Sequence, residues 1–327
     1  MLELVAKRAV MMLITFIGIT LLTFIFLRLV PGDAAALKAG GTEISFNSGA
    51  VVKAKELYGL NRPVILEYVK WLGRTARLDF GDSFVDHRPV RDKILEALPI
   101  TLLINFLALI VIYVLAIPLG LFSAIERGGA FDKITSVTLY LLYSLPIFWV
   151  GTMLIVIFGG GDHLSWFPIA GIVSDGVEVL PWYGRTMNVL WHLVLPVLCL
   201  SYGGLAFMTR FSRSAMCDVV SKDYLQAARA KGVSEPMVIF KHAGRNILIP
   251  MITLTGLIIP SLLSGSVIVE QIFSIPGMGN LSFQAVLTRD YPLVMAIVSM
   301  GAIVTMLSYF VTDILYYAVD PRMRGDK

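Results

Sequence analysis

The run LPITLLINFLALIVIYVLAIPLGLF, from Leu98 to Phe122, decides the fold class. It contains no Asp, Glu, Lys or Arg. A helix needs about 20 apolar residues to cross the hydrocarbon core of a membrane. A charge at the centre of such a helix costs roughly 2.5–3.5 kcal/mol. The run therefore predicts a transmembrane helix.

Runs of the same apolar character recur along the chain, at 9–27, 134–158, 186–209, 246–269 and 291–312. Only 15% of the 327 residues are charged, against about 25% in a soluble domain. The first run is too long for a signal-peptide core, so we read it as a retained span. We therefore expect an all-α membrane protein with six transmembrane helices.

The positions of Lys and Arg predict the orientation. With the N-terminus inside, these residues number two, two, seven and three in the inner segments 1–8, 123–133, 210–245 and 313–327. The outer loops 159–185 and 270–290 hold one each. The outer loop 28–97 holds eleven, but the positive-inside rule is counted over loops of up to about 60 residues. We expect both termini to be cytoplasmic.

Three parts follow from this arrangement. Residues 1–30 are the N-terminal segment with the first span, residues 31–97 form a small extracytoplasmic helical cap, and residues 98–327 form the transmembrane core. The inner loop 210–245 belongs to that core.

Two short helices are predicted in the cap, at Val51–Tyr58 and at about Pro63–Arg77. Asn61 can cap the second helix, with Pro63 in its first turn. Tyr68 and Trp71 on this helix are residue types that favour the membrane–water interface. We expect the cap to lie on the outer surface.

The most polar stretch between two spans is DYLQAARAKGVSEPMVIFKHAGRNILIP, from Asp223 to Pro250. Tyr224–Lys231 contains no Gly or Pro and is rich in Ala, which predicts a helix. Gly232 is placed to end that helix in a left-handed conformation, and Ser234 can cap a returning helix. We expect a short helix held crosswise beneath two spans.

The residues at i, i+3, i+4 and i+7 of this short helix are Tyr224, Ala227, Ala228 and Lys231, so they share one face. Alanines make the helix thin. A groove on another protein could therefore approach its backbone closely.

The pattern Gln226-Ala227-Ala228-x3-Gly232, followed by Ile247-x2-Pro250, resembles the coupling loop, or EAA loop, of ABC importer permeases. Other segments resemble the dipeptide/oligopeptide/nickel branch of that family. They are RLVPGD at 28–33, YGLNRP at 58–63, DFGDS at 79–83, RPV at 88–90, EQIFSIPGMG at 270–279, Asp313 and DPR at 320–322. The similarity runs nearly from end to end, in the family's order.

The resemblance implies a type I ABC importer permease fold and a role as half of a translocation path. The expected substrates are short peptides, dipeptides or oligopeptides, with nickel chelates as the alternative. The expected partners are a second homologous permease subunit in a heterodimer, two cytoplasmic ATP-binding subunits, an extracytoplasmic substrate-binding protein and the lipid bilayer, and no nucleic acid. The expected location is the cytoplasmic or inner membrane of a bacterium or archaeon, with several spans.

The resemblance also assigns the contact with the ATPase. The residues implied are Asp223, Tyr224, Gln226, Ala227, Ala228, Lys231 and Gly232. Gln226 stands where the family has Glu, so we expect shape complementarity with the ATPase at this position and not an ion pair.

No catalytic role is expected for this chain. It lacks a G-x4-G-K-[ST] motif, so ATP and Mg²⁺ are assigned to the partner ATPase subunits, and no cofactor or metal site is expected here. An intramembrane enzyme would need a catalytic pair within the spans. A secondary transporter usually has inverted repeats and intramembrane charges, and the sequence shows neither.

Four polar residues are candidates for the path or its gate: Glu270, Asn105, Ser144 and Ser264. Glu270 could line the outer gate, or it could be an interfacial carboxylate that caps local backbone. The other three could line a wet pore, or they could make ordinary polar contacts between helices. No residue distinguishes dipeptides from longer peptides or nickel chelates.

Overall fold

The computed structural model describes residues 2–29, 63–160, 164–220, 222–234 and 260–319, together with residues 237, 238, 243, 254 and 258. Over these ranges the secondary structure is helical apart from two isolated β-bridges, and the predicted all-α fold is confirmed. The chain divides into two compact units. One comprises residues 1–99 and 277–327, and the other residues 100–276. Each unit is described by itself below.

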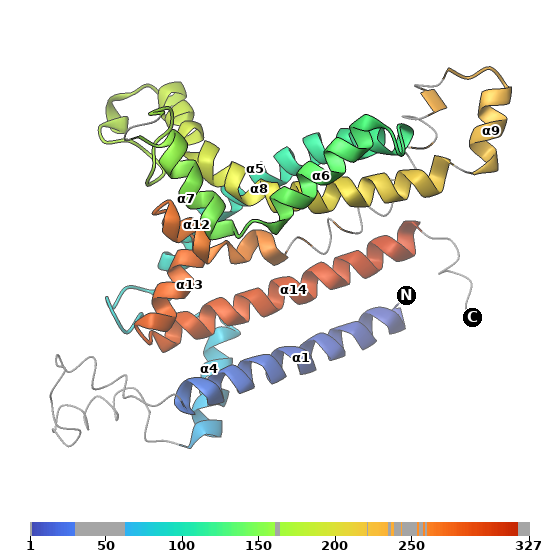
Figure 1. The fold of residues 1–327 in the computed structure, drawn as a ribbon. Coiled ribbons are helices and arrows are strands. Elements are labelled where there is room, and N and C mark those ends of the chain that lie inside the picture. The colour runs from blue at the N-terminus through green and yellow to red at the C-terminus, as the bar shows by residue number, and fades with distance from the viewer. Residues whose placement is uncertain are drawn as a thin grey trace. The chain divides into compact units, whose positions relative to one another are not determined.

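Four helices in the described part are long and apolar enough to cross a membrane. They are α1 (Leu2–Leu29), α5 (Val90–Ile125), α8 (Trp182–Val220) and α14 (Tyr291–Val319) (Figure 1). They cover the first, second, fourth and sixth of the predicted runs. The fifth run, 246–269, lies mostly outside the described residues, so six spans stay a prediction.

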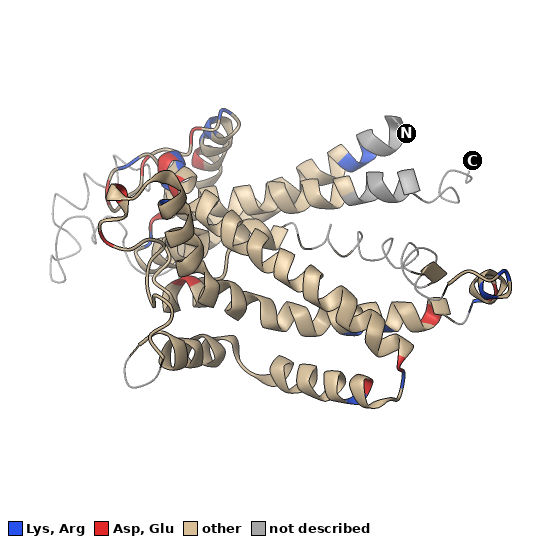
Figure 2. Cartoon of the chain, turned by 90° about the horizontal axis from the view of Figure 1, so that it is seen from above, with Lys and Arg blue, Asp and Glu red and all other residues tan. Residues whose placement is uncertain are grey.

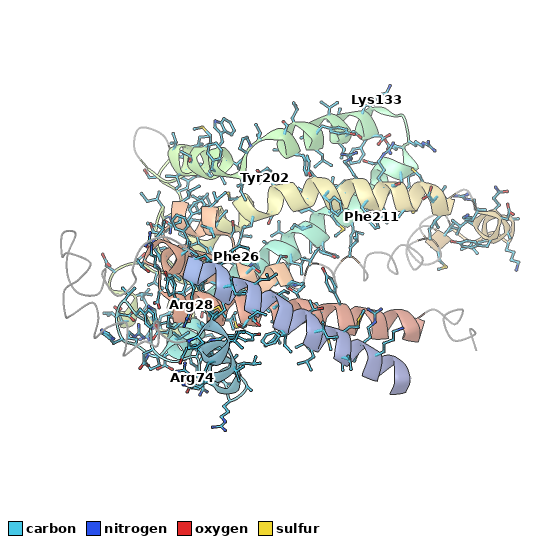
Figure 3. The ribbon with its side chains drawn as sticks, turned by 90° about the horizontal axis from the view of Figure 1, so that it is seen from below. Phe26, Arg28, Arg74, Lys133, Tyr202 and Phe211 are labelled. Atoms are coloured by element: carbon cyan, nitrogen blue, oxygen red, sulfur yellow. The ribbon has the colours of Figure 1, made fainter. Side chains whose placement is uncertain are left out.

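The third predicted run, 134–158, is present as a bent pair of helices that together could make a fifth span. It is broken into α6 (Ala130–Ser144) and α7 (Ile147–Phe158), which meet at 99°. Pro146 lacks an N–H and disfavours a helical conformation in the residue before it, and Leu145 is extended (φ −79°, ψ 132°). The Tyr202 hydroxyl on α8 donates to the Leu145 carbonyl at 2.7 Å, which stabilises the break (Figure 3).

In the first unit, α1 and α14 lie side by side (Figure 1), and the predicted helix at 63–77 is present as α4 (Val64–Thr75). Tyr68 and Trp71 are only 5% and 6% exposed, because they pack against α1 and against Met295 of α14. The Tyr68 hydroxyl lies 2.8 Å from Thr20 Oγ1. The two rings therefore dock the cap helix on α1 and α14, and its place on the outer surface stays a prediction. The helix predicted at 51–58 and its neighbour Asn61 lie outside the described residues.

A polar cluster fixes the segment between α4 and α5. Asp290, which precedes α14, is buried and accepts hydrogen bonds from the Ser83 hydroxyl and from the Phe84 amide, the latter at 2.9 Å. Nearby, Lys93 Nζ donates to Asp86 at 2.8 Å. Burial by itself raises the pKa of Asp86, but the hydrogen bonds from Lys93 and Ser83 outweigh it and lower the pKa to about 2. The DFGDS motif thus joins the cap to the last helix.

In the second unit, α8 packs against α5, α6 and α7, and Gly120 of α5 lies directly against the backbone of α8. A Cβ on Gly120 would lie 2.5 Å from Ser212 Cβ and 2.7 Å from the Thr209 carbonyl oxygen. Backbone cannot yield as a flexible side chain can, so glycine is required here.

Replacing Gly120 with valine is expected to force α5 and α8 apart. Overpacking of a filled core costs about 1–3 kcal/mol or more, so the yield of folded protein and its melting temperature in detergent should fall. Gly203→Ala in α8 is the control, because no atom lies within 4 Å of the Cβ it would add. Equal melting temperatures for the two variants would contradict the close packing.

Candidate functional site

The polar segment after α8 forms the helix α9 (Asp223–Ala230), as predicted from its composition. Lys222 begins it in an extended conformation, without a side-chain cap. Asp223 lies in its first turn and Arg229 in its last turn. Negative charge near a helix N-terminus and positive charge near its C-terminus both interact favourably with the helix dipole. This short helix is therefore stabilised at both ends.

Gly232 ends α9 in the left-handed conformation that the sequence predicts, with φ +78°. Its amide donates to the Arg229 carbonyl at 2.9 Å, and the Val233 amide donates to the Ala228 carbonyl at 3.3 Å. This pair of bonds is the Schellman motif, which satisfies carbonyl groups at a helix end. The return helix predicted from Ser234 lies mostly outside the described residues.

Leu225 packs α9 against α5 and α8 within the second unit. It is 0% exposed and joins a cluster with Leu121 of α5 and with Met208 and Met216 of α8. Ala228, one turn later, packs half-buried against the same cluster. Sequence reasoning missed this anchor, although Leu225 is the one aliphatic side chain larger than Ala in α9.

The other implied contact residues lie on the outer side of the helix. Asp223, Tyr224, Gln226, Ala227, Lys231 and Gly232 are all exposed. The structure therefore brings six of the seven together on accessible surface, with Ala228 at the edge of that surface. The exposed Ala227 gives the helix a thin outer face. Gln226 offers an amide and no charge.

An ion pair links the start of α6 to α8 within the second unit. Arg213 donates from Nε to Asp132 Oδ1 at 2.5 Å and from Nη2 to Oδ2 at 2.7 Å. The amide of Gly128 donates to Asp132 Oδ2 at 2.9 Å. In this unit, charged residues gather at the α5–α6 turn, the end of α8 and α9, while the bodies of α6 and α8 carry few (Figure 2). The pair thus braces the end of the unit that carries α9.

The pKa of Asp132, which precedes the apolar run starting at Ile134, is held at about 2. The hydrogen bonds from Arg213 lower it most, burial opposes them, and the Gly128 amide lowers it further. A carboxyl group whose pKa is lower in the folded protein than in the unfolded chain stabilises the fold at pH values above the unfolded pKa. That stability is lost only as the pH falls toward 2. The carboxylate is therefore ionised at all physiological pH values.

Replacing Asp132 with asparagine is expected to leave the Arg213 guanidinium without its charged partner. A hydrogen bond to a charged group contributes about 1.5–3 kcal/mol and less where solvent screens it, as at Arg213, which is 31% exposed, so the melting temperature of the purified protein should fall. Arg213→Lys keeps the charge but loses the two-point geometry, and it should give an intermediate value. An unchanged melting temperature in Asp132→Asn would contradict the brace.

The four path candidates fall into two pairs, all within the second unit. Glu270 lies on α12 (Val267–Ile272), is only 4% exposed, and accepts a hydrogen bond from the Thr101 hydroxyl of α5 at 3.0 Å. One turn along α5, Asn105 Nδ2 donates to the Leu262 carbonyl at 2.9 Å. The N-cap of α12 is Ser266, whose hydroxyl accepts from the Val269 amide at 3.4 Å. Glu270 is thus a buried carboxylate that contacts α5.

Ser144 and Ser264 are each hydrogen-bonded within their own helix. Each hydroxyl donates to a carbonyl of its own turn, Ser144 to Leu141 at 2.8 Å and Ser264 to Pro260 at 3.1 Å. Such bonds within a helix are the usual way to satisfy a serine in an apolar environment. Among the residues with described side chains, no group of three or more His, Cys, Asp or Glu is arranged to hold a metal ion.

Comparison with known proteins assigns the family. Residues 116–325 match the profile described as "Binding-protein-dependent transport system inner membrane component", and residues 1–105 match that of the N-terminal part of such components. The chain is 38% identical over 320 residues to an oligopeptide transport system permease protein of Bacillus subtilis, with 98% of each chain covered.

Two more relatives match over nearly their whole length. A peptidoglycan transport system permease protein of Agrobacterium fabrum is 31% identical over 353 residues, covering 98% of this chain and 97% of that protein. A di/tripeptide transport system permease protein of Pseudomonas aeruginosa is 35% identical over 340 residues, covering 100% of both. With the exposed α9 and the helical fold, these matches show that the chain belongs to the inner-membrane components of binding-protein-dependent transport systems, the permease subunits of ABC importers.

Proposed function

We propose that this chain forms half of the translocation path for short peptides, and that α9 is the helix through which the ATPase moves it. As a permease subunit it is not an enzyme, and it works with separate ATPase and binding-protein subunits. The observation that carries the proposal is α9 itself, an exposed Ala-rich helix fixed by one buried leucine and closed by a left-handed glycine.

The mechanism we propose is mechanical. ATP and Mg²⁺ are bound by two partner ATPase subunits, whose dimer closes on ATP binding. The outer side of α9, with Tyr224, Gln226, Ala227, Lys231 and Gly232, would lie in a groove of the ATPase and follow it. Leu225 then passes the movement to α5 and α8, because a packed side chain moves with the core that surrounds it. The spans would tilt between inward-facing and outward-facing states.

The remaining geometry is proposed on the same basis. Both termini face the cytoplasm, the 31–97 cap faces the binding protein, and a homologous permease supplies the other half of the path in a heterodimer. Glu270 on α12 and Asn105 on α5 are the best candidates for polar groups near the path, because a buried carboxylate next to a span is costly and usually functional.

The substrate class rests on relatives whose names specify oligopeptides, di/tripeptides and peptidoglycan. Nickel chelates are the second candidate, on the resemblance of the motifs alone. The test is uptake into proteoliposomes that contain the permease pair, the ATPases and the binding protein. ATP-dependent uptake of radiolabelled di- and tripeptides is expected. Uptake that follows an ion gradient and survives without ATP would overturn the proposal, and uptake of nickel–histidine alone would favour the second candidate.

A further inference from the structure

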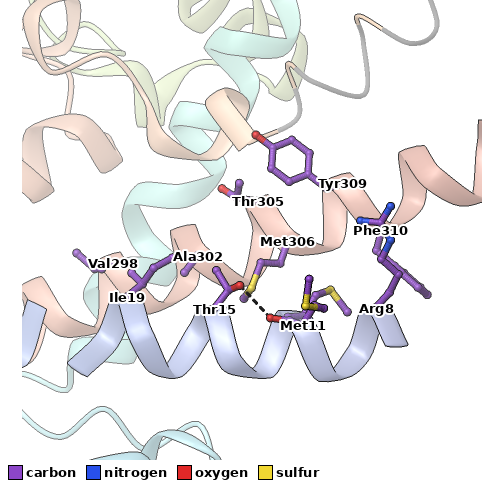
Figure 4. Close-up of a pocket in the computed structure, with 11 residues that line it drawn as sticks. Arg8, Met11, Thr15, Ile19, Val298, Ala302, Thr305, Met306, Tyr309 and Phe310 are labelled. Carbon is purple, nitrogen blue, oxygen red and sulfur yellow. Dashed lines mark hydrogen bonds between the residues drawn. The ribbon is translucent and has the colours of Figure 1, made fainter. Parts of the chain in front are cut away.

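A groove of about 560 Å³ lies between α1 and α14, within the first unit (Figure 4). Its α1 wall is a single stripe from Arg8 through Met11, Met12 and Thr15 to Ile19. These positions are spaced by three or four residues, so they share one helix face. The α14 wall is an equivalent stripe from Val298 to Phe310. The groove is therefore made by two helix faces that do not close completely on each other.

We propose that this groove holds one acyl chain of an anionic phospholipid, whose phosphate is bound by Arg8. Arg8 is the one charged residue among the described residues that line the groove, and it lies at one end. A guanidinium binds phosphate through two parallel hydrogen bonds. The other described residues of the lining are apolar or carry a hydroxyl.

The dimensions fit a lipid chain. From Arg8 to Ile19 the groove follows α1 for about 17 Å at 1.5 Å per residue. One leaflet is half of the ~30 Å hydrocarbon core, so the groove runs from headgroup depth to about the bilayer centre. Met11 and Ile19, which line the groove, are both exposed, so a lipid chain can reach it.

The lining also suits a flexible chain better than a partner helix. Met11, Met12 and Met306 contribute three unbranched thioether side chains, which adapt to irregular apolar shapes. Helices that pack tightly in membranes instead approach through small residues at regular spacing. On the proposed orientation, the Arg8 end lies in the cytoplasmic leaflet, where anionic lipids attract basic residues.

The test uses the assembled transporter in nanodiscs that contain phosphatidylglycerol with a photoactivatable acyl chain. After irradiation, labelled peptides are mapped by mass spectrometry. Labelling is expected to concentrate on the α1 and α14 stripes, and to exceed labelling by a matched phosphatidylcholine. Arg8→Gln should lower it about fivefold, the value of one basic residue at an anionic surface.

Ala302→Phe, which fills the groove and leaves the charge in place, should also abolish groove labelling. Val10→Phe is the control, because Val10 is exposed on α1 but does not line the groove. Even labelling of all lipid-facing helices, equal labelling by both lipids, or no effect of Arg8→Gln would overturn the proposal. Should Ala302→Phe fail to fold, the Arg8→Gln result decides.

The leaflet is tested separately, by the accessibility of a cysteine placed at position 7 to a membrane-impermeant reagent in inside-out vesicles. Labelling of the groove together with an externally accessible position 7 would refute the proposed orientation and leave the lipid site standing. A position 7 that is accessible only from the cytoplasmic side, together with no labelling of the groove, would support the orientation and refute the lipid site.

Discussion

Transport by the Gly232→Val variant is expected to fall about tenfold or more, while the chain still inserts into the membrane. Gly232 has φ +78°, and a residue with a Cβ pays roughly 1–2 kcal/mol in this region, with β-branched valine at the upper end. A cost of 1.4 kcal/mol is a factor of about ten. The two hydrogen bonds that close α9 depend on this conformation. ATP hydrolysis by the complex should continue without transport, and both rates are measured in proteoliposomes.

The matched control for this prediction is Gly232→Asn, because asparagine adopts the left-handed conformation more readily than other residues. No atom lies within 4 Å of the Cβ that a substitution at 232 would add, so the effect of valine is on backbone conformation and not on packing. Gly232→Asn should keep most of the transport. Equal loss in both variants would point to a steric contact with the partner instead.

The second large effect is expected at Leu225. Truncation to alanine removes the one fully buried side chain of α9, and such a change costs about 2–5 kcal/mol. Because α9 is short and makes few other buried contacts, we expect the helix to detach from the cluster around Met208 and Met216. Transport should fall more than tenfold, and hydrolysis should become less dependent on the binding protein. Both activities are measured in the reconstituted complex.

Leu225→Met is the control at this position. A swap that conserves volume usually costs less than about 1.5 kcal/mol, so transport should stay near that of the unmodified protein. The apolar runs of α5 and α8 are unchanged in both variants, so insertion into the membrane is expected for both. Full transport by Leu225→Ala would show that movement does not pass through this side chain.

The long helices could be predicted from the sequence because their signal is long and simple. A run such as Leu98–Phe122 has one physical explanation, since it can be stable only in lipid or in a large apolar core. The same holds for the end of α9, where Gly232 after an Ala-rich segment predicts a left-handed residue that ends the helix. Composition and local geometry are sufficient in both cases.

Contacts between distant residues could not be predicted in this way. The proline at 146 was visible, but many membrane helices continue through a proline, as α8 does at Pro196. Tyr202, 57 residues away, donates its hydroxyl to the Leu145 carbonyl and so stabilises the 99° break. The Asp132–Arg213 pair, the burial of Tyr68 and the Glu270–Thr101 bond are likewise long-range. Periodicity carries no information on such pairs.

The central claim is that the outer side of α9 meets an ATPase subunit, and site-directed cross-linking tests it most directly. Cys199 and Cys217, the two free cysteines, would be replaced first, and a single cysteine would be introduced as Ala227→Cys. Val179→Cys is the control, because Val179 is 89% exposed in the short helix η1 (Val177–Val179), which is proposed to face the other side of the membrane.

A short thiol-reactive cross-linker would be added to the assembled complex during ATP hydrolysis, and the products would be identified by mass spectrometry. The account predicts a permease–ATPase product from Ala227→Cys, with a yield that changes when ATP is bound, and none from Val179→Cys. An assembled, hydrolysing complex in which Ala227→Cys gives no ATPase product would contradict it.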